Sequence, residues 1–189
     1  MPYSADTFVA DEQPTTAKWN KLWSNDASFN DGSGLGDNTI THERLNSSVA
    51  FLARRTTDQT GIVTATATKV QYATEDMDRG SDYDNATNYR FTAPYNGDYH
   101  LSAGVHIDAP GTGGQSIDLR KNGTTSLSFK FDYSPAASND NSSVVSNTVP
   151  LAAGDYVEVF ATHNAGANRT FIGSLVGGCF FSGFLVGRY

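Results

Sequence analysis

Cysteine is nearly absent from this 189-residue chain, which contains only Cys179. A single cysteine excludes an intrachain disulfide, so packing and hydrogen bonds must hold the fold together. Cys179 lies among Gly178, Phe180 and Phe181, and no histidine or basic residue is its sequence neighbour. We therefore predict that Cys179 is a small buried apolar side chain and not a nucleophile.

Positive charge is also scarce. Thirteen lysines and arginines face 20 aspartates and glutamates, which gives a formal net charge of −7. Phosphate backbones and anionic membrane surfaces repel such a protein, so we expect no nucleic-acid partner. No apolar run is long enough to span a bilayer, and residues 1–6 lack the basic and apolar regions of a signal peptide. We expect neither membrane insertion nor a signal peptide.

Patterns of catalytic and metal-binding residues are missing too. The four histidines form no metal-ligand pair, and His100 and His106 are predicted to face solvent on one strand, about 20 Å apart. No Gly-x-Ser-x-Gly elbow is present, and no clustering of serine, histidine and aspartate in the sequence suggests a catalytic triad. We therefore predict a protein that is not an enzyme and has no resident cofactor.

One acidic segment, residues 75–84, leaves a metal site open. It contains five carboxylates, and oxygen ligands of this kind suit Ca²⁺. The candidate ligands are Asp76, Asp78, Asp82 and Asp84. The spacing is not that of an EF-hand loop and Arg79 interrupts it, so a solvated, turn-rich loop is the favoured alternative.

The residues that are abundant favour strands joined by tight turns. The chain has 18 glycines, 11 phenylalanines and 9 tyrosines but no long runs of leucine, lysine and glutamate. From residue 48 onward, eight to ten short apolar or alternating segments are separated by turn signals. Residues 61–68 and 170–176 are among the predicted strands, and residues 179–186 are apolar enough for a central strand buried on both faces. The pattern predicts an all-β sandwich or barrel.

Residues 1–47 differ from the predicted head, residues 48–189. Trp19, Leu22 and Trp23 are spaced i, i+3 and i+4, and the preceding segment Pro14–Thr15–Thr16 can start a helix. We predict a mostly irregular N-terminal arm with one short helix. Such a helix is marginal alone and needs a surface to dock on. That surface could belong to its own head or to a neighbouring protein, and the sequence leaves both open.

Several motifs of the head resemble, in order, those of the globular domains of the complement-q and tumour-necrosis-factor superfamily. Phe91, Pro94, Gly97 and Tyr99 follow the family's Phe-x-x-Pro-x-x-Gly-x-Tyr pattern. The other matching segments are the strand at 51–54, the Asn-Gly turn at 119–123, Leu-x-x-Gly-Asp-x-Val at 151–157 and Phe-x-Gly-Phe-Leu at 181–185. The resemblance covers about three quarters of the chain.

This resemblance implies a jelly roll of about ten strands that assembles as a homotrimer. The final aromatic strand has apolar side chains on both faces, and a single sandwich can bury only one of them. Candidates for the core or the trimer interface are Tyr99, Leu101, Phe180, Phe181 and Phe184. The sequence alone does not separate core from interface.

A second resemblance concerns the arm. Residues 7–20 are similar to the N-terminal segments of bacteriophage virion proteins that carry comparable heads on fibres and decorations. It implies a virion structural protein, a trimeric capsid decoration or short fibre, assembled in the host cytoplasm. The arm would bind capsid, neck or tail proteins, and the head could contact host glycans or proteins through loops near residues 108–115 and 134–143.

Three other functions remain open. One is a tail-associated receptor-binding protein that recognises host glycans. Another is an extracellular recognition module of the complement type, which would need export. The third, a glycan-modifying enzyme on a jelly-roll scaffold, would need paired carboxylates facing one groove.

Overall fold

The computed structural model describes residues 49–108, 113–134, 140–174 and 177–189. Throughout these ranges the regular secondary structure is β. The strands are β1 (Ala50–Arg54), β2 (Gln59–Ile62), β3 (Thr68–Lys69), β4 (Thr74–Arg79), β5 (Tyr83–Asp84), β6 (Arg90–Thr92), β7 (Gly97–Ile107), β8 (Gly113–Lys121), β9 (Thr125–Ser134), β10 (Asn141–Leu151), β11 (Tyr156–His163), β12 (Arg169–Phe171) and β13 (Phe180–Arg188).

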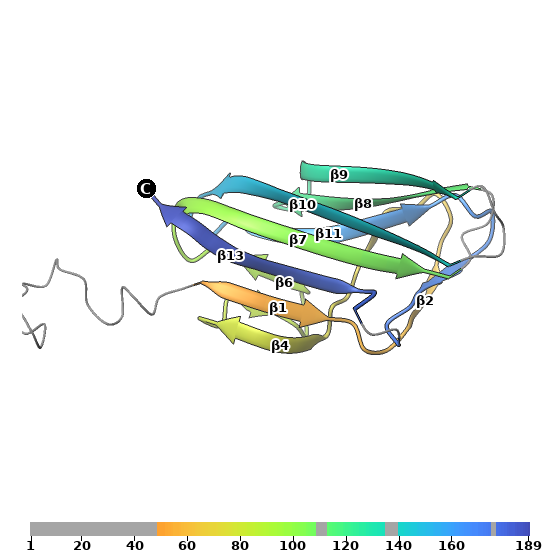
Figure 1. Cartoon of the computed structure of the whole chain (residues 1–189), viewed down its shortest axis with the longest axis horizontal. Coiled ribbons are helices and arrows are strands. Elements are labelled where there is room, and N and C mark those ends of the chain that lie inside the picture. The colour runs from red at the N-terminus through yellow and green to blue at the C-terminus, as the bar shows by residue number, and fades with distance from the viewer. Residues whose placement is uncertain (1–48, 109–112, 135–139, 175–176) are drawn as a thin grey trace, which may run out of the picture. The chain divides into compact units, whose positions relative to one another are not determined.

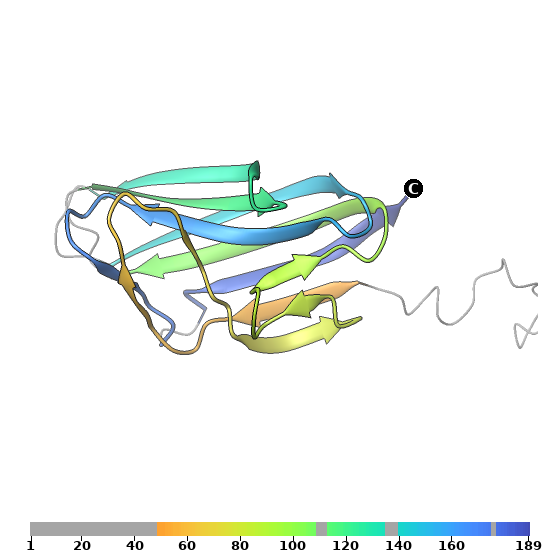
Figure 2. The same ribbon diagram turned by 180° about the vertical axis from the view of Figure 1, so that it is seen from behind.

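Two antiparallel sheets pack face to face (Figure 1). The first sheet has the order β2-β12-β7-β13-β1-β4, and β10 also pairs with β7. The second has the order β5-β6-β11-β8-β9, with β3 paired to β11, and it faces the viewer in Figure 2. The predicted all-β jelly-roll sandwich is therefore confirmed. The predicted arm, its short helix and the residues Trp19, Leu22 and Trp23 lie outside the described residues.

Strand alternation places the core between the sheets. Along β7, Tyr99, Leu101 and Ala103 point inward and are fully buried, because successive side chains of a strand project to opposite faces. Aromatic rings fill much of this core: Phe51 stacks on Phe91 at 4.7 Å between ring centroids. Such pairs add stability beyond the apolar area they bury.

The Asn-Gly turn predicted between two strands is confirmed. Asn122 and Gly123 both have positive φ, 52° and 77°, as a tight hairpin turn between β8 and β9 requires. Asn122 also uses its side chain: its amide donates to Asp155 Oδ1 at 2.8 Å and its oxygen accepts from the backbone N–H of Tyr156 at 3.0 Å. This turn is thereby fixed to the end of β11.

The strand predicted over residues 61–68 is wrong. β2 ends at Ile62, and a turn follows in which Ala65 has a φ of 56°. The backbone N–H of Ala65 instead donates to the carbonyl of His163 at 2.7 Å. A β-branched run alone did not reveal this turn, because the tertiary contact decides it. The strand predicted over 170–176 is shorter and shifted, since β12 covers Arg169–Phe171.

Residues Ser48–Tyr189 group into one compact unit. The strand number exceeds the predicted ten because several two- and three-residue strands, such as β3 and β5, are too short for a sequence pattern to show. Within the described ranges, no helix has the length and apolar character that crossing a membrane would require.

Candidate functional site

The outer face of the first sheet is formed by every second residue of its strands. Phe184 on β13 lies between Ala50 of β1 and His100 of β7, and Phe180 lies between Arg54 and Gly104. The inward-pointing residues of the same strands include Tyr99, Leu101 and Phe181, which are fully buried in the core of the subunit. The structure thus places three of the five core-or-interface candidates inside the sandwich and two, Phe180 and Phe184, on its outer face.

Several large apolar side chains are exposed on this outer face. Phe184 is 50% exposed, and Val186 on the same strand is 58% exposed. Val144 on β10 and Met77 on β4 are 46% and 38% exposed. The terminal strand, predicted to be buried on both faces, is central in its sheet but buried on only one face within a single subunit. Exposed apolar side chains spread over three strands of one sheet are typical of an interaction surface.

His100 and His106 lie on the same side of β7, a strand inside this sheet, and are both half-buried. His100 Nδ1 lies 3.1 Å from Thr148 Oγ1, its Nε2 lies 3.1 Å from Ser146 Oγ, and its ring packs against Phe184 at 5.3 Å. Two short hydroxyl side chains therefore contact His100, so polar groups lie beside the exposed apolar side chains of this face.

His106 brings together a serine and an aspartate that sequence reasoning missed. Its Nδ1 lies 2.5 Å from Ser142 Oγ, and its Nε2 lies 3.5 Å from Asp140 Oδ2. The pairing of β7 with β10 places Ser142 opposite His106, a contact between residues far apart in the sequence. In a hydrolytic triad Nε2 faces the serine and Nδ1 donates to the aspartate. Here these roles are exchanged and the aspartate contact is long, so we assign no catalysis to this group.

The four predicted metal ligands do not converge. Asp76 forms an ion pair with Arg54 across β1 and β4. Asp78 accepts hydrogen bonds from the backbone N–H groups of Asp82 and Tyr83 at 3.2 and 2.9 Å. Among the described residues, no group of three or more histidines, cysteines or carboxylates could hold a metal ion. The segment 75–84 is also not the expected loop, because most of it forms β4 and β5.

Asp84 is occupied by its own loop. Its carboxylate accepts from the backbone N–H groups of Ala86, Thr87 and Asn88 at 2.9 to 3.1 Å. The hydrogen bond from Thr87, followed by those from Ala86 and Asn88, lowers the pKa of Asp84 to about 2. The carboxylate closes a turn between β5 and β6, which explains its position without a metal.

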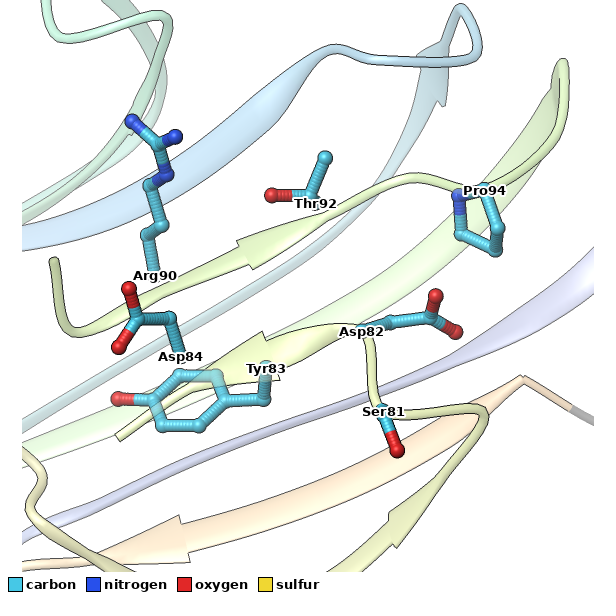
Figure 3. A pocket seen from close by; sticks show the side chains of 7 residues that line it. All are labelled: Ser81, Asp82, Tyr83, Asp84, Arg90, Thr92 and Pro94. Carbon is cyan, nitrogen blue, oxygen red and sulfur yellow. The ribbon is translucent and has the colours of Figure 1, made fainter. Parts of the chain in front are cut away.

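An open pocket of about 340 Å³ lies beside these residues (Figure 3). Its lining residues are Ser81, Asp82, Tyr83, Asp84, Arg90, Thr92 and Pro94. Burial raises the pKa of Asp82, and the neighbouring carboxylate of Asp78 raises it further. Arg90 stacks on the ring of Tyr156 at 4.2 Å. The pocket is shallow and its charged groups have partners within the sandwich, apart from Asp82.

Cys179 is 1% exposed and accepts a hydrogen bond from the backbone N–H of His106 at 3.2 Å. Burial raises the pKa of its thiol, which disfavours the thiolate that a nucleophile or metal ligand needs. The prediction of a buried apolar side chain is therefore confirmed.

A protein-family model for the C1q domain matches residues 50–186. The chain belongs to the C1q domain family. Within this C1q head, Gly183 of the terminal motif lies where a side chain would collide: a Cβ would be 2.5 Å from Leu101 Cδ2 and 2.8 Å from Phe51 Cε1. The resemblance seen in the motifs at 91–99 and 181–185 thus has a structural basis in the core.

Solved structures show the same fold. The C1q head is similar to the globular domain of zebrafish complement 1qA protein, with 21% identity and a TM-score of 0.53, over 75% of this chain and 99% of that one. It is also similar to Eiger TNF from S. frugiperda (13%, TM-score 0.57, 75% and 94% covered) and to murine APRIL (15%, TM-score 0.54, 74% and 100% covered). No curated protein matches the chain.

Proposed function

We propose that this chain is a homotrimeric structural and binding protein whose subunits meet through the outer face of the first sheet. The observation that carries the proposal is the exposure of Phe184 and Val186 on a central strand. In a monomer these apolar side chains stay in contact with water and add no stability through burial. Membership of the C1q domain family supports an assembly of three identical subunits, which is also what the resemblance of the motifs implies. The polar group of His100, Ser146 and Thr148 would then supply hydrogen bonds that fix the register between subunits.

We propose further that the protein is a bacteriophage virion component, a capsid decoration or short fibre. Support comes from the resemblance of residues 7–20 to N-terminal segments of virion proteins. In this role residues 1–47 would bind a capsid, neck or tail protein, and the trimeric head would project outward. Assembly would take place in the host cytoplasm, where a chain with one buried thiol and no disulfide needs no oxidising compartment.

An extracellular recognition module of the complement type is the second candidate. The family match over residues 50–186 favours it as much as the virion role. Both candidates use the same trimeric head, and neither requires a catalytic centre. They differ in where the chain is found.

Particle composition separates the two candidates. Virus particles are purified on a density gradient and analysed by quantitative mass spectrometry. A non-structural protein of the same lysate is measured as the control for proteins that contaminate the particle fraction. The virion role predicts that the chain co-purifies with particles in a copy number divisible by three. Recovery only from the culture medium, free of particles, contradicts the virion role and supports the extracellular one.

A further inference from the structure

A second exposed surface lies on the other sheet and is entirely aromatic. We call Phe129, Phe131 and Tyr133 the aromatic stripe. They alternate along β9 and are 59%, 53% and 67% exposed. Two residues of a strand span about 7 Å, so the three side chains follow one another over about 14 Å. No described element of the subunit covers them.

The register with β8 shows that the stripe belongs to the outer face of the second sheet. Phe129, Phe131 and Tyr133 lie opposite Asp118, Ser116 and Gly114, whereas the intervening β8 residues Ile117 and Leu119 are buried. The stripe is therefore on the opposite side of the sandwich from Phe184. The subunit interface proposed above uses the outer face of the first sheet, and the inference that follows does not depend on it.

Gly114 allows one ring of the stripe to lie on the sheet. The tip of the Phe131 ring occupies the space that a Cβ at Gly114 would fill. The Phe131 ring therefore leans across to β8 toward Gly114, the residue opposite Tyr133, and does not project straight out from the sheet. It lies close to the backbone of β8 at Gly114, two residues from Ser116.

Polar groups next to the stripe are short or already paired. Asp118 is 7% exposed and accepts from Arg120 Nε at 2.6 Å and from Ser126 Oγ at 2.6 Å, whereas Lys130 and Asp132 alternate with the stripe and lie on the other face of β9. Arg120 also stacks on Phe160, with its guanidinium 4.6 Å from the ring centroid. Each of these charges is balanced by an opposite charge within reach, so the surface is complementary to an uncharged partner.

We propose that the aromatic stripe binds an extended, uncharged glycan. A sugar ring offers an apolar C–H face that can stack on an aromatic ring, and hydroxyl groups at its edge that can bond to Ser116 and Ser126. A protein partner is a poorer fit, because hot spots at protein interfaces become fully desolvated, whereas each ring of the stripe stands alone in its row along β9. The exposed apolar side chains of the stripe are also all aromatic, with no aliphatic anchor among them.

The test uses the full chain, titrated by calorimetry with three uncharged hexasaccharides: cellohexaose, chitohexaose and maltohexaose. A Phe131→Leu/Tyr133→Leu variant keeps most of the apolar area but removes two rings. A Phe131→Tyr/Tyr133→Phe variant keeps both rings. Val63→Ser is the control, since Val63 is a 48% exposed apolar side chain outside β9. Sedimentation velocity on every variant reports the oligomeric state.

The proposal predicts that at least one hexasaccharide binds, that the leucine variant binds it about tenfold more weakly or worse, and that the ring-keeping variant and the control bind as the wild type does. Three outcomes overturn it: no hexasaccharide binds the wild type, the leucine variant binds equally well, or the leucine variant sediments as a smaller species. The last would make the stripe a subunit contact. The first two outcomes do not depend on whether the wild type is a trimer, and the third applies only to a wild type that is an oligomer.

Discussion

Individual carboxylates of this protein do structural work that depends on their ionisation. Asp84 accepts three backbone hydrogen bonds, and its pKa falls from an ordinary 3.8 to about 2. Asp155 behaves similarly, since the hydrogen bond from Lys121, with those from Asn122 and Ala152, lowers its pKa to about 2. An acid with a depressed pKa in the folded state stabilises the fold above its unfolded pKa. That contribution is lost as the pH falls from about 4 toward 2.

Replacing Asp84 by alanine should destabilise the head by about 1–2 kcal/mol at pH 7, because three backbone N–H groups lose their acceptor. Urea unfolding at pH 7, 4 and 2.5 measures the effect, and the gap between wild type and variant should shrink over the two lower values. Asp82→Asn is the matched control. Burial raises the pKa of Asp82 in the wild type, so the charge of this carboxylate opposes folding at pH 7. The Asp82→Asn variant should therefore be at least as stable as the wild type. A gap for Asp84→Ala that stays constant with pH would contradict this account.

Gly183 is required for a packing reason. A Cβ there would meet Leu101 and Phe51 of the core at 2.5 and 2.8 Å, whereas a Cβ at Gly187 of the same strand meets nothing within 4 Å. We expect Gly183→Ala to cost about 1–3 kcal/mol of unfolding free energy and Gly187→Ala to cost much less. Chemical denaturation of both variants at one protein concentration makes the comparison. Equal losses would show that the two glycines serve only backbone conformation.

At the scale of elements, β13 has two faces with different consequences. Phe181 points into the core, where it packs edge-on against Phe51 at 4.9 Å, and Phe184 points outward. Phe181→Ala should lower the unfolding free energy by about 3–5 kcal/mol at every protein concentration. Phe184→Ser should lower the melting temperature only where subunits associate, because association stabilises by mass action. Thermal melts over a hundredfold concentration range distinguish the two: the loss of Phe181→Ala relative to the wild type should stay constant, and the loss of Phe184→Ser should grow with concentration. A Phe181→Ala loss that also grows with concentration would contradict the division of faces.

Sequence patterns predicted the elements that carry strong local signals. The sequence of β7 alternates between apolar and polar residues, and that of β13 is almost continuously apolar. The Asn122–Gly123 turn was predictable because these two residue types readily adopt the positive φ that a tight hairpin needs. The turn at Ala65 was missed because a hydrogen bond to the carbonyl of His163, nearly a hundred residues away, decides it. The contact of His106 with Ser142 was missed for the same reason. Core and surface candidates could not be separated, because β13 carries both kinds and only the packing of the second sheet selects Phe181 over Phe184 for the core.

The arm and the carboxylates mark another limit of sequence reasoning. Asp76, Asp78 and Asp84 have the ligand chemistry that suits calcium, but in the fold each is used by a local partner: Arg54, the 82–83 backbone and the 86–88 turn. Spacing alone gave no information about these partners. The docking of Trp19, Leu22 and Trp23 remains a prediction.

At the scale of the whole molecule, the C1q head divides its surface between two tasks. The outer face of the first sheet carries apolar side chains, and histidines in contact with hydroxyl groups, which suit self-association. The outer face of the second sheet carries an aromatic stripe suited to an uncharged ligand. Three heads around one axis would present three stripes, and multivalent attachment raises avidity without any new contact. A structural virion role and host contact are therefore compatible within one assembly.

Sedimentation velocity of the full chain and of Phe184→Ser tests the central claim most directly. The account predicts a wild-type species of about 61 kDa, three times the 20.3 kDa chain mass, over the micromolar range. It predicts that Phe184→Ser shifts this species toward the monomer while the circular dichroism stays that of a folded β protein, and that Val63→Ser does not. A wild-type chain that sediments as a monomer at every concentration, or a trimer that Phe184→Ser leaves intact, would contradict it.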